Sequence, residues 1–333
     1  MTAPRVSVVL PFRDAAATLG EALDSLRVQT LADFECLLID DASRDASRQI
    51  AADYVASDAR FRLLDGGHGL VDALNRGVAA AGAALIARMD ADDISLPERL
   101  ARQADTLMAD PTLSAVGCLV ECFPAADTGA GMRRYVEWLN SLVTPEAIRA
   151  AIFVESPIAH PSAMLRRDAL CAIGGYRDTG GPEDYDLWLR LVLDGHRLGK
   201  VPLPLLHWRD GSGRLSRVDP RYARAGFFAT KLAHFSRAVP STTGLQIWGA
   251  GPTGRAWARA LRERGYRVSR FVDVAPQRWG RRLGGVPVEP PGDPDASAGF
   301  ALVATGSPGA RVSIEALFTT HELRPWRDYL SVA

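Results

Sequence analysis

Three aspartates are crowded into the stretch "IARMDADDISL" (residues 86–96), directly after an apolar run. Asp90, Asp92 and Asp93 repel one another unless a positive charge neutralises them. Alternate residues of an extended chain point the same way, and Mg²⁺ and Mn²⁺ bind carboxylate oxygens together with substrate phosphates. The stretch therefore fits either a metal site or an acidic turn that caps the helix starting near Ser95.

Two other acidic groups also have residue types that could take part in catalysis or binding. Asp40 and Asp41 end the apolar stretch "FECLLIDD" (34–41). Glu183, Asp184 and Asp186 follow Pro182 in "GGPEDYDLW". In the first turn of a helix, acids interact favourably with the helix dipole whatever their function, so this pattern alone favours a structural role for the second group.

The elements that must position these acids alternate in type along the first 90 residues. Strands are predicted at residues 5–12, 34–41, 60–67 and 84–90, and helices at 15–28, 43–57 and 69–83. This alternation predicts an α/β fold with a mostly parallel sheet flanked by helices. Ligands of such sheets bind outside the carboxyl ends of the strands. Asp40 and Asp41 stand at one such predicted end, and the stretch from Asp90 to Asp93 stands at another.

The rest of the chain predicts further elements and one domain boundary. Helices are expected at residues 97–110, with Pro97 at the first helical position, at 136–153 with a break at Pro145, and at 182–194; a strand is expected at 113–122 and a loop at 124–134. A polar break at 236–244 precedes a new strand. A length of 333 residues favours two domains, and we place them at 1–240 and 241–333.

Charge and hydropathy exclude several classes of protein. Lys+Arg and Asp+Glu both number 39, so the chain has no long-range attraction to nucleic acid. No stretch reaches the ~18 apolar residues of a membrane span, and the first apolar run is too short for a signal peptide. Four cysteines make no disulfide framework in a chain of this length. We expect a cytoplasmic protein, with peripheral association at the inner face of the membrane still allowed.

Four stretches together resemble one known family. "SVVLPFRDAAATLGEALDSLRVQT", "FECLLIDDASRDAS", "ALIARMDADDISLPERL" and "GGPEDYDLWLRL" occur in its order and at its spacing. Over residues 4–235 the chain resembles the family 2 inverting glycosyltransferases of GT-A fold. The resemblance implies transfer of a sugar from a nucleotide-diphosphate donor, with UDP favoured, to the hydroxyl of a saccharide or lipid-linked saccharide in cell-surface polysaccharide or glycolipid biosynthesis.

The resemblance also implies a role for each acid. Asp92 would bind Mn²⁺ or Mg²⁺, with Asp90 beside it on the sugar or ribose and Asp93 in support, and the cation would stabilise charge on the departing diphosphate. Inversion needs a base that takes the acceptor's proton, and Asp184, paired with Glu183, is the candidate. The base and ribose of the nucleotide would contact Pro11, Arg13, Asp40 and Asp41.

Two other stretches match family segments. "ESPIAHPSAMLRRDAL" makes His160 a candidate for acceptor binding. "LLHWRDGSGRLSR" (205–217) resembles a segment that covers the diphosphate, which implies contacts from Arg209 and Ser216. Many relatives carry a histidine where this chain has Gly211, so a metal or phosphate contact from that side depends on a substitute such as His207.

The last 90 residues carry a second ligand-binding pattern. "LQIWGAGPTGRAWARALRERGYRVSRFVDV" combines a strand, the glycines Gly249, Gly251 and Gly254, a helix, and a second strand ending at Asp273. Such glycines allow a tight turn at a pyrophosphate and close helix packing, and the acid can bind ribose hydroxyls. The pattern resembles Rossmann-like domains and predicts either a second site for a nucleotide or NAD(P), or a domain that serves stability or assembly without a ligand.

Other functions therefore remain open at this stage. The chain could be an NAD(P)-dependent oxidoreductase or a nucleotide-sensing protein that acts through the C-terminal part. It could also be a degenerate transferase that serves as a binding partner, although the acids are intact at every expected position.

Overall fold

The computed structural model describes residues 3–126, 128–211, 213–294 and 299–333. Contacts divide the chain into two compact units. The first comprises Met1–Arg149 and Ser156–Phe227, and the second comprises Ala150–Glu155 and Phe228–Ala333. The domain division at residue 240 stays a prediction. Among the described residues, no helix has both the length and the apolar character needed to cross a bilayer.

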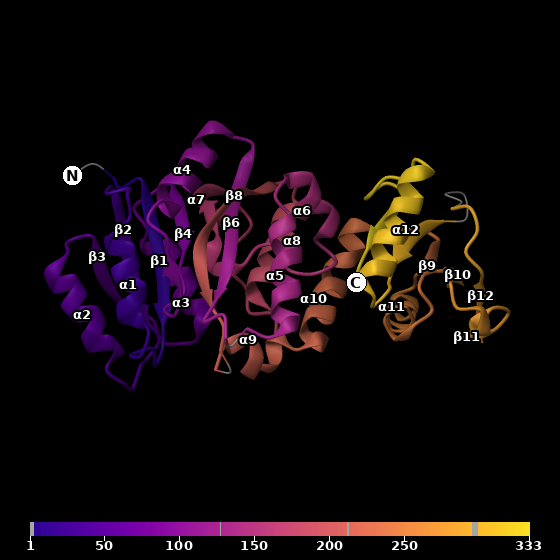
Figure 1. Ribbon diagram of the computed structural model, residues 1–333, viewed down its shortest axis with the longest axis horizontal. Helices are drawn as coiled ribbons and strands as arrows, with labels where there is room; N and C mark the ends of the chain where they lie inside the picture. The colour runs from indigo at the N-terminus through magenta and orange to yellow at the C-terminus, as the bar shows by residue number, and fades with distance from the viewer. Residues whose placement is uncertain (1–2, 127, 212, 295–298) are drawn as a thin grey trace. The chain divides into compact units, whose positions relative to one another are not determined.

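The first unit is built on a sheet whose first half is parallel. Its order is β3-β2-β1-β4-β7-β6-β8-β5, and Figure 1 shows β3, β2, β1 and β4 side by side. These four strands are β1 (Val6–Phe12), β2 (Phe34–Asp40), β3 (Phe61–Asp65) and β4 (Leu85–Arg88). Because Phe12 is in register with Asp40, the carboxyl ends of β1 and β2 lie at the same edge.

The second half of this sheet is mixed and returns the chain to that edge. β7 (Met164–Arg166) runs antiparallel to β4 and to β6 (Leu113–Phe123). β8 (Arg197–Arg209) runs parallel to β6 and antiparallel to the short β5 (Ile94–Ser95). The pairing of Ile94 with His207 brings the end of β8 against the aspartate stretch.

The helices of this unit cover the sheet with apolar faces. In α1 (Leu19–Arg27), the residues Leu19, Leu23 and Leu26 are fully buried, and truncating such a leucine to alanine costs about 2–5 kcal/mol. The other helices are α2 (Ser47–Ser57), α3 (Leu70–Ala80), α4 (Arg99–Ala109), α5 (Ala130–Ser141), α7 (Arg167–Ala172), α8 (Glu183–Leu193) and α9 (Leu215–Val218), while α6 (Pro145–Ala151) and α10 (Arg224–Ala238) each begin in the first unit and end in the second.

Among the helix boundaries that differ from the sequence-based prediction are the starts of α2, α4 and α5. α2 begins at Ser47 because Ser43 is used in the preceding loop, where its N–H donates to Asp40 Oδ1 at 2.9 Å. α4 begins at Arg99, after Leu96 N–H has bonded to the Leu205 carbonyl of β8. α5 begins at Ala130, inside the predicted loop, because its apolar side chains pack on the core. Tertiary contacts decide all three.

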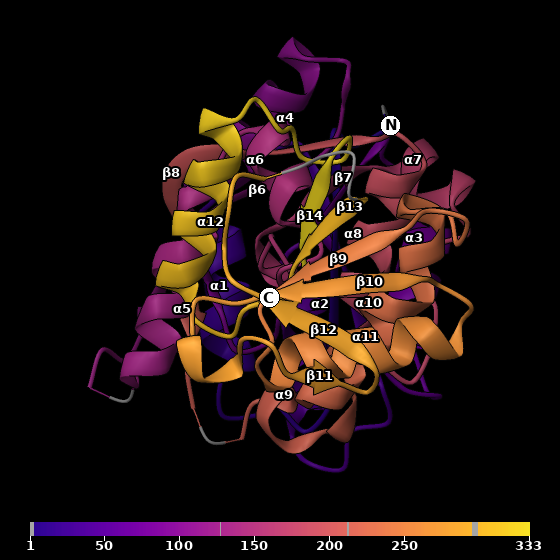
Figure 2. The ribbon, with the colours of Figure 1, turned by 90° about the vertical axis from the view of Figure 1, so that its right-hand side faces the viewer.

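The second unit contains a doubly wound sheet. Its order is β11-β12-β10-β9-β13-β14, and all pairings except β11 with β12 are parallel. Figure 2 shows β12, β10, β9, β13 and β14 fanned in this order. The strands are β9 (Leu245–Trp248), β10 (Val268–Val272), β11 (Arg282–Leu283), β12 (Val286–Glu289), β13 (Phe300–Val303) and β14 (Tyr329–Ser331), with α11 (Pro252–Glu263) and α12 (Pro308–Thr320). The order reverses between β9 and β13, which is where doubly wound sheets bind ligands.

Candidate active site

A cleft of about 410 Å³ opens at the carboxyl edge of the first sheet. The end of β1 contributes one side of it and the loop after β4 another, while the segment after β8 adds Gly211 and Gly213. The cleft lining includes Pro11, Arg13, Asp90, Asp92, Arg209 and Arg214. The structure therefore brings together five residues that the sequence predicted for donor or metal binding, and it adds Arg214.

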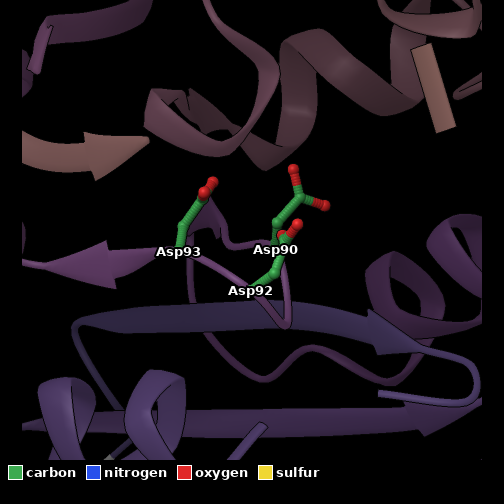
Figure 3. Close-up of side chains that lie close together, drawn as sticks. All are labelled: Asp90, Asp92 and Asp93. Atoms are coloured by element: carbon green, nitrogen blue, oxygen red, sulfur yellow. The ribbon is translucent and has the colours of Figure 1, made fainter. Parts of the chain in front are cut away.

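The three aspartates form one cluster on the loop after β4. One carboxylate oxygen from each of Asp90, Asp92 and Asp93 lies within 4.8 Å of the other two. Figure 3 shows their side chains rising from this loop toward the same side. Three convergent carboxylate oxygens are a donor set that suits Mg²⁺ or Mn²⁺.

Burial and mutual repulsion disfavour the charged forms of the carboxylates in this cluster. Burial, and then the neighbouring charge of Asp90, raise the pKa of Asp92 to about 6. Burial and both neighbours raise the pKa of Asp93 well above its usual value. The Asp93 Oδ2 atom is buried and has no hydrogen-bond partner among the described residues. A divalent cation would relieve both the repulsion and the unmet acceptor, so the residues present fit a metal.

Two arginines hold the aspartate loop in place. The buried Arg88 pairs with Asp90, with Nη1 at 2.5 Å from Oδ1. Arg209, at the end of β8, donates its backbone N–H to Asp93 Oδ1 at 2.8 Å and its Nε–H to the Asp92 carbonyl at 2.6 Å. Its guanidinium also pairs with Glu21 and lies 4.4 Å from the centre of the Phe123 ring. Arg209 thus orients the acids while it lines the cleft.

The segment after β8 presents a further cation that sequence reasoning missed. The Arg214 guanidinium lies 4.2 Å from the centre of the Trp208 ring, and its Nη1 is 3.8 Å from Asp210 Oδ1. An arginine directly after the glycine-rich "GSG" was the signal that could have identified it. By contrast, Ser216 is exposed on α9, and His207 faces Glu121 at 3.5 Å; neither belongs to the cleft-lining set.

Asp40 and Asp41, at and after the end of β2, differ in their hydrogen-bond partners. Asp40 accepts hydrogen bonds from Ser43 N–H at 2.9 Å and Arg48 Nη1 at 3.0 Å. Burial would raise the pKa of Asp40, but these bonds lower it. Asp41 Oδ1 accepts from Gly69 N–H at 2.9 Å, and its Oδ2 lies 3.9 Å from Arg13 Nη1. Asp41 therefore stands beside a cleft residue, whereas Asp40 holds the loop.

The acid pair at the start of α8 is unequal. Glu183 is buried, and its Oε2 accepts the Tyr222 hydroxyl at 2.6 Å. Burial opposes its charge, but hydrogen bonds from His160 and Tyr222 lower the pKa of Glu183 to about 2. Asp184 is half-buried, and its Oδ2 accepts the Ser156 hydroxyl at 3.3 Å. Asp186 is committed to a buried ion pair with Arg190 at 2.7 Å.

His160 lies in the turn η1 (His160–Ser162) and contacts Glu183 directly. Its Nδ1 is 3.5 Å from Glu183 Oε1, and its Nε2 is 3.0 Å from the Tyr176 hydroxyl. Burial and the charge of Arg88 lower the pKa of His160. Only 7 % of the residue is exposed, and its acceptor-binding role stays a prediction. In the structure it contacts the Glu183 carboxylate.

Arg99 joins the aspartate loop to this turn. Its buried guanidinium donates from Nη1 to the Arg88 carbonyl at 3.0 Å and to the Pro161 carbonyl at 2.9 Å. Its Nε donates to Ser95 Oγ at 2.7 Å. Sequence reasoning did not find it, because two of its partners are backbone carbonyls that carry no sequence signal. Arg99 thus ties the aspartate loop to the turn that carries His160, and His160 in turn contacts Glu183.

The glycine-rich loop of the second unit is arranged differently. Gly249 has φ +116°, and a Cβ at Gly254 would lie 1.8 Å from the Gly249 carbonyl oxygen, whereas one at Gly251 would meet nothing within 4 Å. Asp273 accepts from Ala250 N–H at 2.6 Å, from Ala275 N–H at 2.8 Å and from Arg278 Nη1 at 2.8 Å. Burial opposes the charge, but these bonds lower the pKa of Asp273. The protein itself supplies partners for this carboxylate.

Comparison with known sequences identifies a family over half of the chain. The family described as "Glycosyl transferase family 2" matches residues 7–174, which include the aspartate cluster and His160. EpsE of Bacillus subtilis, a protein named as a glycosyltransferase, is 31% identical over 228 residues, which are 66% of this chain and 78% of EpsE. The amylovoran biosynthesis glycosyltransferase AmsE of Erwinia amylovora is 28% identical over 214 residues, 64% of this chain and 78% of AmsE.

Solved structures share the fold. TarS 1–349 of S. aureus, in complex with UDP-GlcNAc, has a TM-score of 0.57 at 16% identity, covering 71% of this chain and 67% of that chain. The mannosyltransferase PcManGT of Pyrobaculum calidifontis, in complex with GDP-Man and Mn²⁺, has a TM-score of 0.53 at 20% identity, covering 80% and 70%. At these identities the likeness concerns architecture alone, and it confirms the GT-A fold that the sequence motifs imply.

Proposed function

The chain belongs to glycosyl transferase family 2, and from this premise we propose that it transfers a sugar, with inversion at the anomeric carbon, from a UDP-linked donor to an acceptor hydroxyl. The observation that carries the proposal is the aspartate cluster, of which Asp90 and Asp92 line the cleft, with the raised pKa values of Asp92 and Asp93 and the Asp93 oxygen that has no hydrogen-bond partner among the described residues. The relationship to AmsE, named for amylovoran biosynthesis, supports a role in polysaccharide assembly.

The donor's charged end matches the charges of the cleft. Asp92, with Asp90 and Asp93 beside it, would hold Mn²⁺ or Mg²⁺, and the bound cation would neutralise the charge that develops on the leaving diphosphate. The Mn²⁺ named with PcManGT supports this assignment. Arg214 lines the same cleft and supplies a positive charge for phosphate oxygens.

Asp41 can accept a hydrogen bond from a uracil base. One carboxylate oxygen of Asp41 is already bonded to Gly69 N–H, and the other lies toward Arg13. Uracil offers one ring N–H, and an ionised carboxylate retains acceptor sites for it. Pro11 and Arg13 line the cleft at this end, and Asp40 supports them by fixing the loop through Ser43 and Arg48.

Asp184 is the base in this proposal. Direct displacement needs a carboxylate that accepts the proton of the attacking hydroxyl on the face opposite the leaving group. Asp184 is half-buried, so it can meet an acceptor. Glu183 is buried and held by two partners, so it positions the start of α8. His160, which we propose at the edge of the acceptor site, contributes through Glu183.

A donor screen tests the function directly. UDP-GlcNAc, UDP-glucose, UDP-galactose and GDP-mannose are each incubated with the protein, with and without Mn²⁺, and release of nucleoside diphosphate is measured. We expect release from a UDP-sugar that needs Mn²⁺ and falls by about 10²–10⁴-fold in Asp184→Asn, the usual contribution of general base catalysis. Full activity of Asp184→Asn would remove Asp184 from its role, and release from GDP-mannose alone would overturn the choice of nucleotide.

For the second unit we propose a doubly wound, Rossmann-like domain whose loop is closed by its own acid. Asp273 bonds the N–H of Ala250, between Gly249 and Gly251, and pairs with Arg278, so a nucleotide or NAD(P) would have to displace these partners. Thermal-shift titrations with NAD⁺, NADP⁺ and UDP, on the protein and on Gly251→Val, test this. A nicotinamide-dependent shift lost in Gly251→Val would favour the oxidoreductase or nucleotide-sensing function instead.

We place the acceptor, a saccharide or lipid-linked saccharide, at the inner face of the cytoplasmic membrane. The name of AmsE, a glycosyltransferase of amylovoran biosynthesis, supports a saccharide acceptor. Flotation of the protein with liposomes of anionic phospholipid, alone and after addition of a membrane lipid extract, measures the association. Recovery in the bottom fraction in both cases would contradict a membrane-bound acceptor.

A further inference from the structure

Glu183 is enclosed by donors from two different parts of the first unit. On one side stands His160, from the turn η1 that Arg99 ties to the aspartate loop. On the other side the hydroxyl of Tyr222 donates to Glu183 Oε2 at 2.6 Å. A hydrogen bond from a neutral hydroxyl to an ionised carboxylate is short and about twice as strong as one between neutral groups. Tyr222 therefore holds Glu183 by a contact whose loss should be measurable.

Tyr222 belongs to the segment that lines the donor cleft. It lies in the turn η2 (Pro220–Tyr222), eight positions after Arg214, and Gly213 and Arg214 form part of the cleft wall. Local bonds stiffen the connection, because the Asp219 side chain accepts from Arg221 N–H at 2.9 Å and the Asp219 carbonyl accepts from Tyr222 N–H at 3.1 Å. Backbone bonds from Arg217 N–H to the Arg214 carbonyl, at 2.8 Å, and from Asp219 N–H to the Leu215 carbonyl, at 2.9 Å, join this turn to the cleft wall.

The start of α8 depends on such an outside contact. Its N-cap residue, Pro182, makes no side-chain hydrogen bond to the first turn, and uncapped N-termini fray more readily. Asp184 is the next residue after Glu183, and its own bond to Ser156 is longer, at 3.3 Å. Because the two residues are adjacent in the first turn of α8, the position of the Asp184 backbone follows that of Glu183.

We propose that Tyr222 is a positioning residue that couples the donor cleft to the base, by transmitting the state of the 213–222 segment through Glu183 to the first turn of α8. This coupling rests on the proposed function, in which the cleft binds the donor nucleotide and Asp184 accepts the proton. Occupancy of the cleft orders the segment, the Tyr222 hydroxyl fixes Glu183, and Asp184 is held ready only when a donor is present. Its benefit is protection of the donor from transfer to water.

Hydrogen exchange of backbone amides tests the coupling without an acceptor. The full chain is measured with and without UDP and Mn²⁺, which probe the cleft alone. In the unaltered protein, exchange should slow both in residues 213–222 and in residues 184–187 at the start of α8. In Tyr222→Phe, the protection of 213–222 should remain and that of 184–187 should fall by roughly threefold to tenfold, the factor that corresponds to one hydrogen bond.

Two controls separate coupling from general loss of stability. Tyr54→Phe removes a comparable bond, because the Tyr54 hydroxyl donates to Asp24 Oδ1 at 2.7 Å, and it should leave both responses intact. Glu183→Ala removes the other partner of the proposed contact, so it should lose the response of 184–187, and combining it with Tyr222→Phe should add nothing further.

The outcomes are distinct. If residues 184–187 stay protected in Tyr222→Phe, or if they never respond in the unaltered protein although 213–222 does, Tyr222 is only a packing residue and the coupling is wrong. If neither UDP nor GDP with Mn²⁺ protects 213–222, the proposed donor site fails and the coupling fails with it.

Discussion

In each unit, acidic residues follow the carboxyl end of a parallel strand. Their pKa values are shifted in opposite directions in the two units. After β4, Asp92 is half-buried and Asp93 is buried, desolvation and repulsion raise the pKa of each, and Asp93 Oδ2 has no hydrogen-bond partner among the residues described. After β10, Asp273 accepts three hydrogen bonds, one of them from Arg278, and its pKa is lowered.

This difference separates a ligand site from a structural use of the same position. The carboxyl end of a parallel strand is a position where ligands can bind. Uncompensated negative charge at that position indicates in addition that a bound cation would be stabilising. In the first unit Asp90 pairs with Arg88, but Asp92 and Asp93 have no ion-pair partner among the described residues. The acid of the second unit has its cation, Arg278, from its own chain.

The largest expected effect is on turnover. Asp92→Asn should lower nucleoside-diphosphate release by about 10²–10³-fold, because one metal ligand and one charge near the leaving group are lost. Asp273→Asn should leave the rate within about twofold, since this carboxylate serves its own loop. Steady-state rates with saturating Mn²⁺ measure both, and equal losses in the two variants would erase the distinction.

A large effect on stability is expected in the second unit. Gly254→Ala places a Cβ 1.8 Å from the Gly249 carbonyl oxygen, so this unit should lose about 3 kcal/mol or more. Gly251→Ala is the matched control, because its Cβ meets nothing within 4 Å, and it should change the unfolding free energy by less than about 1 kcal/mol. Urea unfolding monitored by tryptophan fluorescence compares them. Similar losses would mean that the loop is not packed as described.

A smaller effect on stability is expected when the carboxylate is removed from either unit. Asp273→Ala leaves Arg278 and the N–H of Ala250 without their partner and should cost about 1–3 kcal/mol. Asp93→Asn, measured without metal, removes a buried and repelled charge and should not destabilise the protein. Thermal unfolding in EDTA decides this, and a larger loss in Asp93→Asn would show that its carboxylate is already compensated.

The smallest effect is a pH dependence of the metal-free protein. The folded-state pKa of Asp92 is about 6, above its ordinary value of 3.8, so the folded state binds a proton more tightly than the unfolded state does. This group therefore adds stability as the pH falls from about 7 toward 4. The rise in Tm between pH 7 and pH 5 should be about 2 °C greater in the unaltered protein than in Asp92→Asn, and Mn²⁺ should abolish the difference. An opposite sign would contradict the electrostatic description.

The strand ends and the acids on them were predictable, because they depend on local pattern. The periodicity that predicted four strands placed Asp41 and Asp92 at one edge of the sheet, and the family motifs correctly implied the GT-A fold. The glycine pattern likewise predicted the turn after β9. Each strand end, each motif and the glycine turn is encoded by a short run of consecutive residues.

The braces of the site could not be predicted, because they join distant segments through groups without a sequence signal. Arg99 bonds backbone carbonyls on two separate turns, and Tyr222 reaches Glu183 across 39 positions. The charge state of Asp273 was equally hidden, because the pattern does not show that Ala250 N–H, from the turn after β9, and Arg278 both bond to its carboxylate. Roles such as that of Asp184 remain predictions until they are measured.

Binding of Mn²⁺ is the most direct test of the account. The electron paramagnetic resonance signal of free Mn²⁺ is titrated with the protein in the presence of UDP. The signal should disappear with one equivalent bound per chain in the unaltered protein and in Asp273→Asn, and should persist in Asp92→Ala. If Asp92→Ala bound Mn²⁺ as tightly as the unaltered protein does, the aspartate cluster would not be the metal site.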